Sequence, residues 1–458
     1  MKISLLFLRL EQESGGDPPL GLAYIAASLR DKTDLEIDIL DIANYPTFKG
    51  LVSYLERKRP DILGIYFCTA TYDYGLKISR QAKKMGIYVV AGGPHATILP
   101  QDLAQEVDVV VMGEGEITFV EAIEAYLRGE SPLAVKGIWF KEDGKVIKNM
   151  GREPVSNLDT LPFPARDILD MERYIRNCQY FDSVDTRLRA TTMIASRGCP
   201  FTCTYCQPTL NKLFGKGIRL RSPNNVVKEI RHLRDRYSID AVFFHDDILT
   251  FDKKWIGDFC NTLNRESPNF IWGCNTRADL IDEALMDEMH KAGLRCLHIG
   301  AESANQRILD DVYHKGITLV DIHRTVNLAK SHNIRTMCFF MLGAPTETEQ
   351  EIKQTIKFAR RLPLDEAVFN ITSPLPGTYL YNLTKEFGYT FSSNWSDFNY
   401  YSKRSYNDSA LSFRKLKYLQ LIALIVFYLR FYRLKYIFRH FSSFQGMRKL
   451  ARKIKRFF

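Results

Sequence analysis

The segment Ser196-Arg-Gly-Cys-Pro-Phe-Thr-Cys-Thr-Tyr-Cys-Gln207 places three thiols, Cys199, Cys203 and Cys206, in a C-x3-C-x2-C spacing. It follows the apolar run Thr192–Ala195, which predicts a short strand, so the thiols are expected on the loop at its C-terminal end. Reactive sites of α/β folds gather at that end. Three thiolates can hold three irons of a 4Fe-4S cluster and leave the fourth open. Structural zinc normally takes four protein ligands, and no fourth Cys or His lies within ten residues. Three reduced cysteines without a metal are the remaining interpretation.

The same segment resembles the signature of the radical S-adenosylmethionine (SAM) enzymes, which share the spacing and an aromatic residue, here Tyr205, before the last cysteine. The resemblance implies that Cys199, Cys203 and Cys206 bind a 4Fe-4S cluster whose open iron holds SAM. It also implies reductive cleavage of SAM to a 5′-deoxyadenosyl radical, with flavodoxin or ferredoxin as an electron donor. These cysteines are the expected metal ligands and catalytic centre.

Size and composition fit a protein of two or three domains. The chain has 458 residues, 45% hydrophobic and 25% charged, which is ordinary for a globular protein. Its start, Met1–Leu10, has too short an apolar run for a secretory signal and lacks a small-residue cleavage site. Nine cysteines, six of them scattered, do not resemble a secreted disulfide framework. We therefore expect a reducing, cytoplasmic location.

The net charge of +10 belongs to the C-terminal end. From Leu411 onward there are thirteen Lys and Arg and no Asp or Glu, so residues 1–410 carry −3. A nearly neutral body argues against a nucleic-acid groove, which needs distributed basic contacts.

The basic end contains two further patterns. Tyr418–Leu429 is a largely apolar run, shorter than the roughly 20 residues that span a bilayer. Two interpretations stay open: a basic amphipathic helix on the inner face of an anionic membrane, and a helix pair packed on the body. The continuation 430–458 repeats basic and aromatic residues with a roughly helical period, through Phe431, Leu434, Tyr436, Phe438, Phe441 and Phe444.

Apolar runs alternate with helical patterns over the first 140 residues. This alternation predicts an α/β domain, a parallel sheet wrapped by helices in the flavodoxin-like or Rossmann-like order. Ligands of such sheets bind beyond the carboxyl ends of the strands. The expected strands are Lys2–Leu10, Glu36–Leu40, Asp61–Phe67, Ile87–Ala91 and Val107–Val111, and the expected helices are Leu20–Arg30, Thr47–Arg57, Tyr72–Lys84 and Ile117–Leu127.

Three loops at these strand ends carry glycines: Pro18-Pro-Leu-Gly21, Gly92-Gly-Pro-His-Ala-Thr97 and Gly113-Glu-Gly-Glu116. Paired glycines let the backbone approach a flat ligand, and turn glycines without a ligand are the alternative. Together the loops resemble the cobalamin-binding domain that precedes many radical SAM enzymes, over about residues 1–140. The resemblance implies that the corrin lies over the strand ends, with its nucleotide tail between sheet and helix. The implied cofactor-binding residues are Gly92, Gly93, Gly113 and Gly115.

Two departures limit how cobalamin is held. Cobalamin domains that use a protein histidine below cobalt carry an Asp-x-His-x-x-Gly loop after the second strand, where this chain has Asp41-Ile-Ala-Asn44. We therefore expect no histidine ligand from that loop. After the third strand, where relatives often have serine, Tyr66 either caps the lower face or fills a site without corrin. His95 is interpreted as structural or near the cofactor edge, not as a cobalt ligand.

The second half predicts a barrel. Val135–Phe140 and Lys145–Ile147 suggest a hairpin, and the proline-rich Leu158–Arg166 suggests a domain connection; Met171–Arg189 is placed at the interface without a firm assignment. Six further strands, taken with the resemblance, indicate a partial (β/α)6 barrel. Expected boundaries are 1–140, 141–189 (hairpin and linker), 190–390 (radical SAM domain) and 391–458 (irregular segment and helical tail). The strand candidates are Thr192–Ala195, Ala241–Phe244, Phe270–Cys274, Arg295–Ile299, Thr336–Phe340 and Ala367–Ile371, with helices at Asn225–Arg236, Lys254–Asn264, Glu283–Ala292, Leu319–His332 and Thr348–Arg361.

The resemblance places SAM-binding residues on the loops after these strands. By itself, the carboxylate pair beside His245 also fits general acid–base work, a metal site or a helix N-cap. The implied contacts are Asp246 or Asp247 for the SAM amino group, Arg277 for its carboxylate, Glu302 and Ser303 for further hydrogen bonds, and Gly343 and Pro345 under the adenine.

Three functions are compatible with these features. The first is cobalamin-dependent C-methylation of an unactivated carbon in a small or lipid-like substrate. The second is an oxidative cyclisation or rearrangement, as in relatives that resemble the anaerobic magnesium-protoporphyrin ester cyclase. The third is a cobalamin or iron–sulfur sensor without turnover, which the intact SAM loops disfavour.

Overall fold

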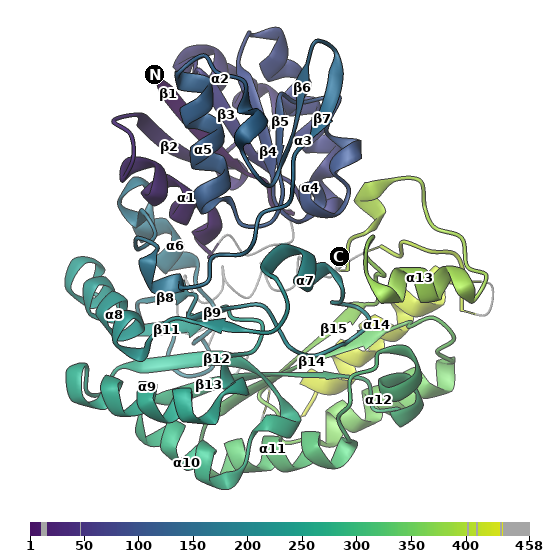
Figure 1. Cartoon of the computed structure of the whole chain (residues 1–458). Helices are drawn as coiled ribbons and strands as arrows, with labels where there is room; N and C mark the ends of the chain where they lie inside the picture. The colour runs from purple at the N-terminus through teal and green to yellow at the C-terminus, as the bar shows by residue number, and fades with distance from the viewer. Residues whose placement is uncertain (11–15, 46, 401–402, 409–410, 431–432, 434–458) are drawn as a thin grey trace.

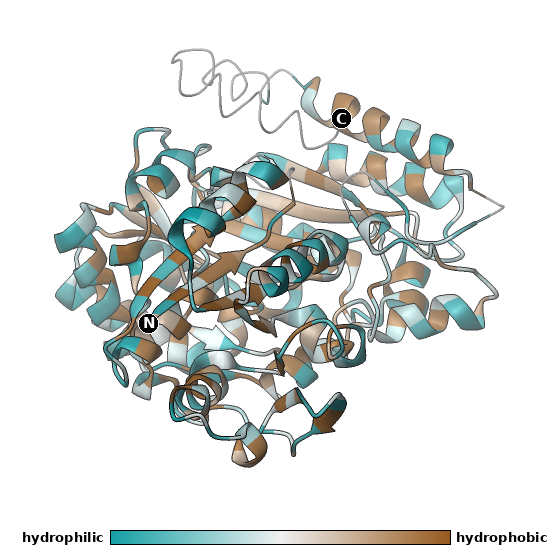
Figure 2. Ribbon diagram, turned by 90° about the horizontal axis from the view of Figure 1, so that it is seen from above, coloured by the Kyte–Doolittle hydropathy of each residue, from teal (hydrophilic) through white to brown (hydrophobic). Residues whose placement is uncertain are grey.

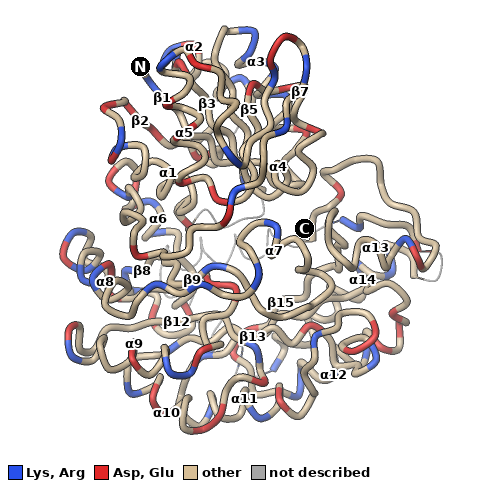
Figure 3. Tube along the Cα trace, viewed as in Figure 1, with Lys and Arg blue, Asp and Glu red and all other residues tan. Residues whose placement is uncertain are grey.

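The computed structural model describes residues 1–10, 16–45, 47–400, 403–408, 411–430 and 433. Two β-sheets, each flanked by helices, lie one above the other in Figure 1, and a long connection joins them. Apolar residues run along the strands of both sheets, as the brown segments of Figure 2 show. Acidic and basic residues are interspersed over both halves (Figure 3).

The N-terminal sheet has the order β2-β1-β3-β4-β5-β6-β7, and its first five strands are parallel. This confirms the flavodoxin-like order expected from the alternation. The hairpin around Asp143-Gly144 pairs antiparallel with β5, so it extends this sheet instead of standing apart. Its strands are β1 (Lys2–Phe7), β2 (Glu36–Asp41), β3 (Ile62–Tyr66), β4 (Tyr88–Gly92), β5 (Val109–Val111), β6 (Ile138–Glu142) and β7 (Lys145–Lys148).

Helices cover both faces of this sheet. One apolar core lies under α1 (Leu20–Arg30) and α5 (Gly115–Leu127), and a second lies under α2 (Phe48–Lys58) and α3 (Tyr72–Lys84). The short α4 (Pro94–Ile98) follows β4. Burial on both faces explains why these parallel strands are continuous apolar runs.

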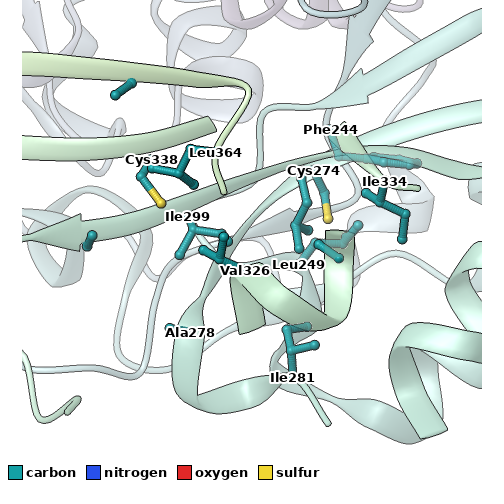
Figure 4. Close-up of a cluster of buried hydrophobic side chains, with 14 of the residues drawn as sticks. Phe244, Leu249, Cys274, Ala278, Ile281, Ile299, Val326, Ile334, Cys338 and Leu364 are labelled. Atoms are coloured by element: carbon teal, nitrogen blue, oxygen red, sulfur yellow. The ribbon is translucent and has the colours of Figure 1, made fainter. Parts of the chain in front are cut away.

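The second sheet is parallel throughout, in the order β15-β14-β13-β12-β11-β8, which confirms the partial barrel. Its outward side chains pack under the surrounding helices, as Phe244, Cys274 and Ile299 show in Figure 4. The strands are β8 (Ala190–Met193), β11 (Ala241–Phe244), β12 (Ile271–Arg277), β13 (Leu294–Glu302), β14 (Arg335–Leu342) and β15 (Glu366–Ile371), and the helices are α8 (Pro223–Tyr237), α9 (Lys253–Glu266), α10 (Glu283–Lys291), α11 (Leu319–Ser331) and α12 (Glu349–Arg361).

The first barrel strand is displaced from its expected position. It ends at Met193, not Ala195, because the Ala195 N–H donates to the Asp246 carboxylate at 3.0 Å and leaves the ladder. The chain then forms β9 (Ser196–Arg197), which pairs antiparallel with β10 (Arg219–Leu220). The cysteine loop and α7 (Thr209–Phe214) therefore lie within a hairpin.

The connection between the sheets includes α6 (Met171–Asn177). The Tyr174 hydroxyl donates to the Asp41 carboxylate at 2.8 Å, and Arg9 binds the same carboxylate at 3.0 and 2.6 Å. Tyr180 stacks on Phe243 of the barrel, with ring centroids 4.3 Å apart. The segment 171–189 therefore contacts both domains.

Helix α14 (Phe413–Tyr428) packs against β15 and α12 (Figure 1). Its buried face consists of Leu416, Leu419, Gln420, Ala423 and Phe427. For this helix the packed interpretation is therefore confirmed. The aromatic series expected beyond it, Phe431, Leu434, Tyr436, Phe438, Phe441 and Phe444, lies outside the described residues. In the part of the chain that the structure describes, no helix is both long enough and apolar enough to cross a membrane.

We predict that Phe427→Ala lowers the free energy of unfolding by about 3–5 kcal/mol, because it leaves a cavity between α14 and the barrel. The Phe427 side chain is 1% exposed and the Arg433 guanidinium covers its ring at 3.6 Å. Tyr418→Ala on the same helix is the control; Tyr418 is 56% exposed, so the expected change is within about 0.5 kcal/mol. Urea unfolding followed by circular dichroism measures both, and equal effects would contradict the packing of α14.

Candidate functional site

A cavity of about 490 Å³ lies between the C-terminal edges of the two sheets. The N-terminal domain contributes strand-end loops and an apolar slot between its sheet and α1 and α5. The barrel contributes the loops after β8 and β11. Lining residues include Leu5, Leu22, Gly64, Val90 and Phe119 in the slot, and Ser196, Arg197, His245, Asp246 and Asp247 on the barrel side. Two sites predicted separately from the sequence therefore face each other.

The four glycines expected near cobalamin all line this cavity. Gly93 and Gly113 have φ of 99° and 70°, which favours glycine at both. A Cβ at Gly93 would lie 2.8 Å from the Phe67 carbonyl oxygen, whereas at Gly92 the nearest atoms are 3.9 Å away. Gly115 instead makes room for Ile25, since a Cβ there would lie 2.7 Å from its side chain. The glycine loops fit a flat ligand, and the slot between the sheet and α1 and α5 has room for a group appended to it, as cobalamin would require.

Asp41 and His95, which were not expected to bind cobalt, both have partners within the protein. Asp41 is buried and held by Arg9 and Tyr174. The buried His95 ring packs on Tyr72 and lies 3.4 Å from the Asp102 carboxylate, and burial lowers its pKa to about 4. His95 is not among the residues lining the cavity, consistent with a structural role. Tyr66 does line the cavity, and the centroid of its ring lies 5.2 Å from that of the Phe7 ring.

The cysteine loop presents three free thiols, with Cys203 buried and Cys199 and Cys206 half-buried. Thr204 anchors the loop, since its N–H and hydroxyl donate to the carbonyls of Tyr313 and Val312 at 2.9 and 2.6 Å. Burial raises the pKa of the Cys206 thiol well above its usual range. In the described residues, no three Cys, His, Asp or Glu converge on a single metal ion. A cubane binds each thiolate to a different iron, so this finding does not bear on it.

Two cations lie beside the thiols. The Arg277 guanidinium donates to Cys203 Sγ at 3.6 Å, and the buried Lys315 ammonium donates to the Tyr205 hydroxyl at 2.9 Å. Positive charge favours thiolate over thiol. Three thiols on one anchored loop, with cations beside them, fit a cluster-binding site.

Asp246 and Asp247 both bind the backbone that leads to Cys199. Asp246 accepts hydrogen bonds from the Ala195 N–H at 3.0 Å and the Ser196 hydroxyl at 2.5 Å. Asp247 accepts one from the Gly198 N–H. Desolvation raises the pKa of each carboxyl to about 6. The resemblance implies that Asp246 or Asp247 binds the SAM amino group, and this stays a prediction; the structure adds that both carboxylates position residues 195–198.

Glu302 lies close to the cysteine loop at the end of β13. Its φ of 61° is unusual for a residue other than glycine, a kind of strain that often marks functional sites. Its carboxylate accepts from the Lys315 ammonium at 3.0 Å and from the Tyr205 hydroxyl at 3.2 Å. A Cβ at Gly300 would lie 2.5 Å from the Glu302 carboxylate, so glycine there leaves space for the pair.

Two of the expected SAM contacts lie in packed surroundings. The Ser303 hydroxyl is buried, 3.4 Å from that of Thr355, and accepts from the Asn305 N–H. The turn at Gly343 has φ of 75°, and a Cβ there would lie 2.7 Å from Leu416 of α14. Glu347 accepts from the backbone N–H groups of Gly343 and Ala344, and burial raises its pKa to about 8. This carboxyl fixes the Gly343–Pro345 turn.

A buried ion-pair network joins the two domains at the cysteine loop. Arg197 and Arg219 lie directly opposite each other in the β9–β10 hairpin. Glu114, from the loop after β5, binds both guanidinium groups, each at 2.8 Å, and also accepts from the Val155 N–H. Glu116 binds Arg197 at 2.5 Å. Like charges opposite each other destabilise a ladder, so the N-terminal domain supplies the charge that this hairpin needs.

Sequence reasoning missed Lys315 and the role of Glu114. Lys315 carries no motif, and only the three-dimensional approach of residues 302, 315 and 205 identifies it. Glu114 lies in a loop that was identified through its glycines. Arg197, which precedes Gly198 and Cys199 in the cysteine motif, was the available signal, because a largely buried arginine needs an acidic partner.

These features define a class: an α/β enzyme in which a cobalamin-type domain faces a partial barrel carrying a three-cysteine loop. A family model described as "Radical SAM superfamily" matches residues 193–359, and one described as "B12 binding domain" matches residues 14–123. The chain belongs to the radical SAM superfamily, with an N-terminal B12-binding domain.

Three known proteins illustrate the similarity. The uncharacterized methyltransferase PH0819 of Pyrococcus horikoshii is 34% identical over 383 residues, covering 82% of this chain and 81% of that protein. The anaerobic magnesium-protoporphyrin IX monomethyl ester cyclase of Rubrivivax gelatinosus is 30% identical over 398 residues, covering 82% and 69%. The radical SAM methyltransferase TsrM of Kitasatospora setae, solved with cobalamin and a 4Fe-4S cluster, has the same fold, with a TM-score of 0.69 at 16% identity, covering 87% of this chain and 81% of that one.

We predict that Glu114→Gln destabilises the protein by about 3 kcal/mol, because it removes the counter-charge that the largely buried Arg197 and Arg219 share and leaves Glu116 to pair with Arg197 alone. Glu121→Gln on α5 is the matched control: Glu121 pairs with Arg152 but is 41% exposed, and such pairs contribute at most about 1 kcal/mol. Urea unfolding measures both, with limited proteolysis at residues 149–170 reporting domain separation. Equal stability of the two variants would contradict a structural role for the network.

Proposed function

We propose that the protein is a cobalamin-dependent radical SAM methyltransferase that methylates an unactivated carbon of a small substrate. The observation that carries the proposal is the single cavity lined by Gly92 and Gly113 from one domain and by Asp246 and Asp247 from the other. Methyl transfer requires the methyl carrier and the site of hydrogen abstraction to reach one substrate. This cavity is bordered by the strand-end glycines of one domain and by the carboxylates that hold the backbone before Cys199 in the other.

In this proposal Cys199, Cys203 and Cys206 hold a 4Fe-4S cluster, which with SAM supplies one-electron chemistry for hydrogen abstraction. Glu302 is oriented by Lys315 and Tyr205 to accept a hydrogen bond from the SAM amino group. Asp247 is exposed to the cavity and is a second acceptor, whereas both oxygens of Asp246 bind the backbone of Ala195. Gly343 and Pro345 shape the adenine side, and Ser303, whose hydroxyl contacts Thr355 and Asn305, stabilises the loop that follows Glu302.

The N-terminal domain would hold cobalamin, which supplies a transferable methyl group. Gly92, Gly93 and Gly113 provide a flat backbone surface, and the apolar slot takes the nucleotide tail. Tyr66, the last residue of β3, lines the cavity and provides no imidazole that could bind cobalt.

Cyclisation or rearrangement without methyl transfer is the second candidate, favoured by the 30% identity with the Rubrivivax cyclase. Product analysis separates the two. Methylation yields S-adenosylhomocysteine together with 5′-deoxyadenosine, whereas the alternative yields 5′-deoxyadenosine alone.

We expect anaerobically reconstituted, reduced protein supplied with cobalamin and SAM to form both products, and Cys203→Ala to lose the cluster iron and both products. Cys260→Ala, at a buried cysteine of α9, is the matched control and should keep both. Iron analysis and chromatography of the SAM products provide the measurements. Unchanged iron in Cys203→Ala would refute the cluster assignment, and no cobalamin absorption in protein purified with cobalamin supplied would refute the methyl carrier.

We further propose a cytoplasmic enzyme that receives electrons from flavodoxin or ferredoxin and touches the anionic inner membrane surface through its basic C-terminal end. Electron donors of this kind match the one-electron chemistry. The support for membrane contact is the charge of the sequence after Leu411, the exposed Tyr418 and Ile425 on α14, and the exposed Leu429 directly after this helix. A lipid-like substrate would be reached from this surface.

Ending the chain after Arg433 keeps α14 and removes eight Lys and Arg. At about 1 kcal/mol for each basic residue near an anionic surface, we expect this truncation to abolish co-sedimentation with phosphatidylserine vesicles. Neutral phosphatidylcholine vesicles are the control. No binding of the full chain to anionic vesicles would contradict the membrane contact.

A further inference from the structure

The cysteine loop has a charged neighbour whose geometry differs from its expected role. Arg277, the last residue of β12, was expected to face the SAM carboxylate. Its side chain is 7% exposed, and its Nη1 donates to Cys203 Sγ at 3.6 Å. The guanidinium carbon lies 3.7 Å from the centroid of the Phe201 ring, which belongs to the same loop. Arg277 therefore contacts the loop between the first two cysteines.

Asp279 fixes this orientation. Its two carboxylate oxygens accept from Nε and Nη2 of Arg277, both at 3.0 Å, which leaves Nη1 directed at the sulfur. The carbonyl of Gly316 accepts a longer bond from Nη2, at 3.5 Å. The Asp279 side chain is 27% exposed, so water screens its charge more than that of the guanidinium. The Cys203 sulfur consequently experiences a net positive field from the pair.

The second cation near the loop is more fully neutralised. Lys315 and Glu302 are 7% and 9% exposed and form a direct ion pair. The Lys315 ammonium also donates to the Tyr205 hydroxyl, and it acts on the Cys203 and Cys206 thiols through its charge and not through a hydrogen bond. Arg277 is thus the cation with a hydrogen bond to a cysteine sulfur.

We propose that the Arg277–Asp279 pair sets the reduction potential of the cluster bound at Cys203. Charge and hydrogen bonds to the sulfur ligands are known determinants of cluster potentials. One-electron reduction adds a negative charge to the cluster, and a cation with a hydrogen bond to a ligand sulfur stabilises that state. Arg277 therefore raises the potential, and Asp279 moderates the increase. Arg277 is a positioning residue for electron transfer and does not need to contact SAM.

The test is a redox titration of the reconstituted protein without SAM. Dithionite, buffered by mediators, supplies the single electron, and the electron paramagnetic resonance signal of the reduced cluster reports the fraction reduced. At a fixed potential near the wild-type midpoint, we expect Arg277→Gln to lower the reduced-to-oxidised ratio about tenfold, a shift of about 59 mV for a one-electron couple. Asp279→Asn is expected to shift the ratio in the opposite direction.

Arg335→Gln and Asp365→Asn are matched controls. The Arg335 and Asp365 side chains form an ion pair with an N–O distance of 2.7 Å. The pair lies at the N-terminal end of β14, whereas the cysteines follow the C-terminal end of the barrel strands. These substitutions should therefore leave the potential of the cluster unchanged. If Arg277→Gln does not retain its cluster, the upward shift in Asp279→Asn still tests the inference.

The inference rests on the proposed cluster, and the outcomes distinguish the two. Absence of any cluster in the wild-type protein would overturn the proposed function and the inference with it. A loaded cluster whose midpoint is unchanged in both Arg277→Gln and Asp279→Asn would overturn the inference alone. A shift in midpoint that occurs only after SAM is added would overturn the inference and support a contact between Arg277 and the SAM carboxylate instead.

Discussion

The shared binding of Glu114 to Arg197 and Arg219 is the interaction on which the arrangement of the site depends. The β9–β10 hairpin encloses the cysteine loop. It consists of two residue pairs, and in one of them Arg197 lies opposite Arg219. Such a hairpin would be repulsive in a barrel standing alone. Glu114 comes from the other domain and is 5% exposed, so the attraction is weakly screened. The same loop carries Gly113, which lines the cavity, and one interaction thus fixes the spacing between both cofactor regions.

Inside the barrel, carboxylates support the backbone at each functional loop. Asp246 and Asp247 hold residues 195–198, and Glu347 holds the Gly343 turn. Each is desolvated, and each has a raised pKa. Proton release from such groups is disfavoured unless N–H donors or a cationic ligand surround them. All three carboxylates accept from backbone N–H groups; Asp247 in addition lines the cavity, where a positively charged partner could approach it.

Much of the fold followed from local pattern. Parallel strands buried on both faces are continuous apolar runs, and the six barrel strands and the flavodoxin-like order were recognised for that reason. The early end of β8 was not predicted. The Ala195 N–H donates to the Asp246 side chain instead of to a neighbouring strand, and Asp246 lies fifty-one residues away in the sequence. The cysteines were found because their spacing is short and local. Lys315 and the contact between Arg277 and Cys203 depend on approaches across the sheet, about which the sequence pattern is silent.

The charges around the thiols also differ between the two sides of the cysteine loop. A cation bonded to Cys203 and a neutralised Lys315–Glu302 pair on the other side make the loop electrostatically asymmetric. An electron arriving at the cluster is stabilised on the Arg277 side, whereas Glu302, strained at φ of 61°, is directed by Lys315 and Tyr205 toward the side where SAM would bind. If the cluster binds at these cysteines as proposed, the residue that acts on its charge and the residue that would accept a hydrogen bond from SAM are different ones, Arg277 and Glu302.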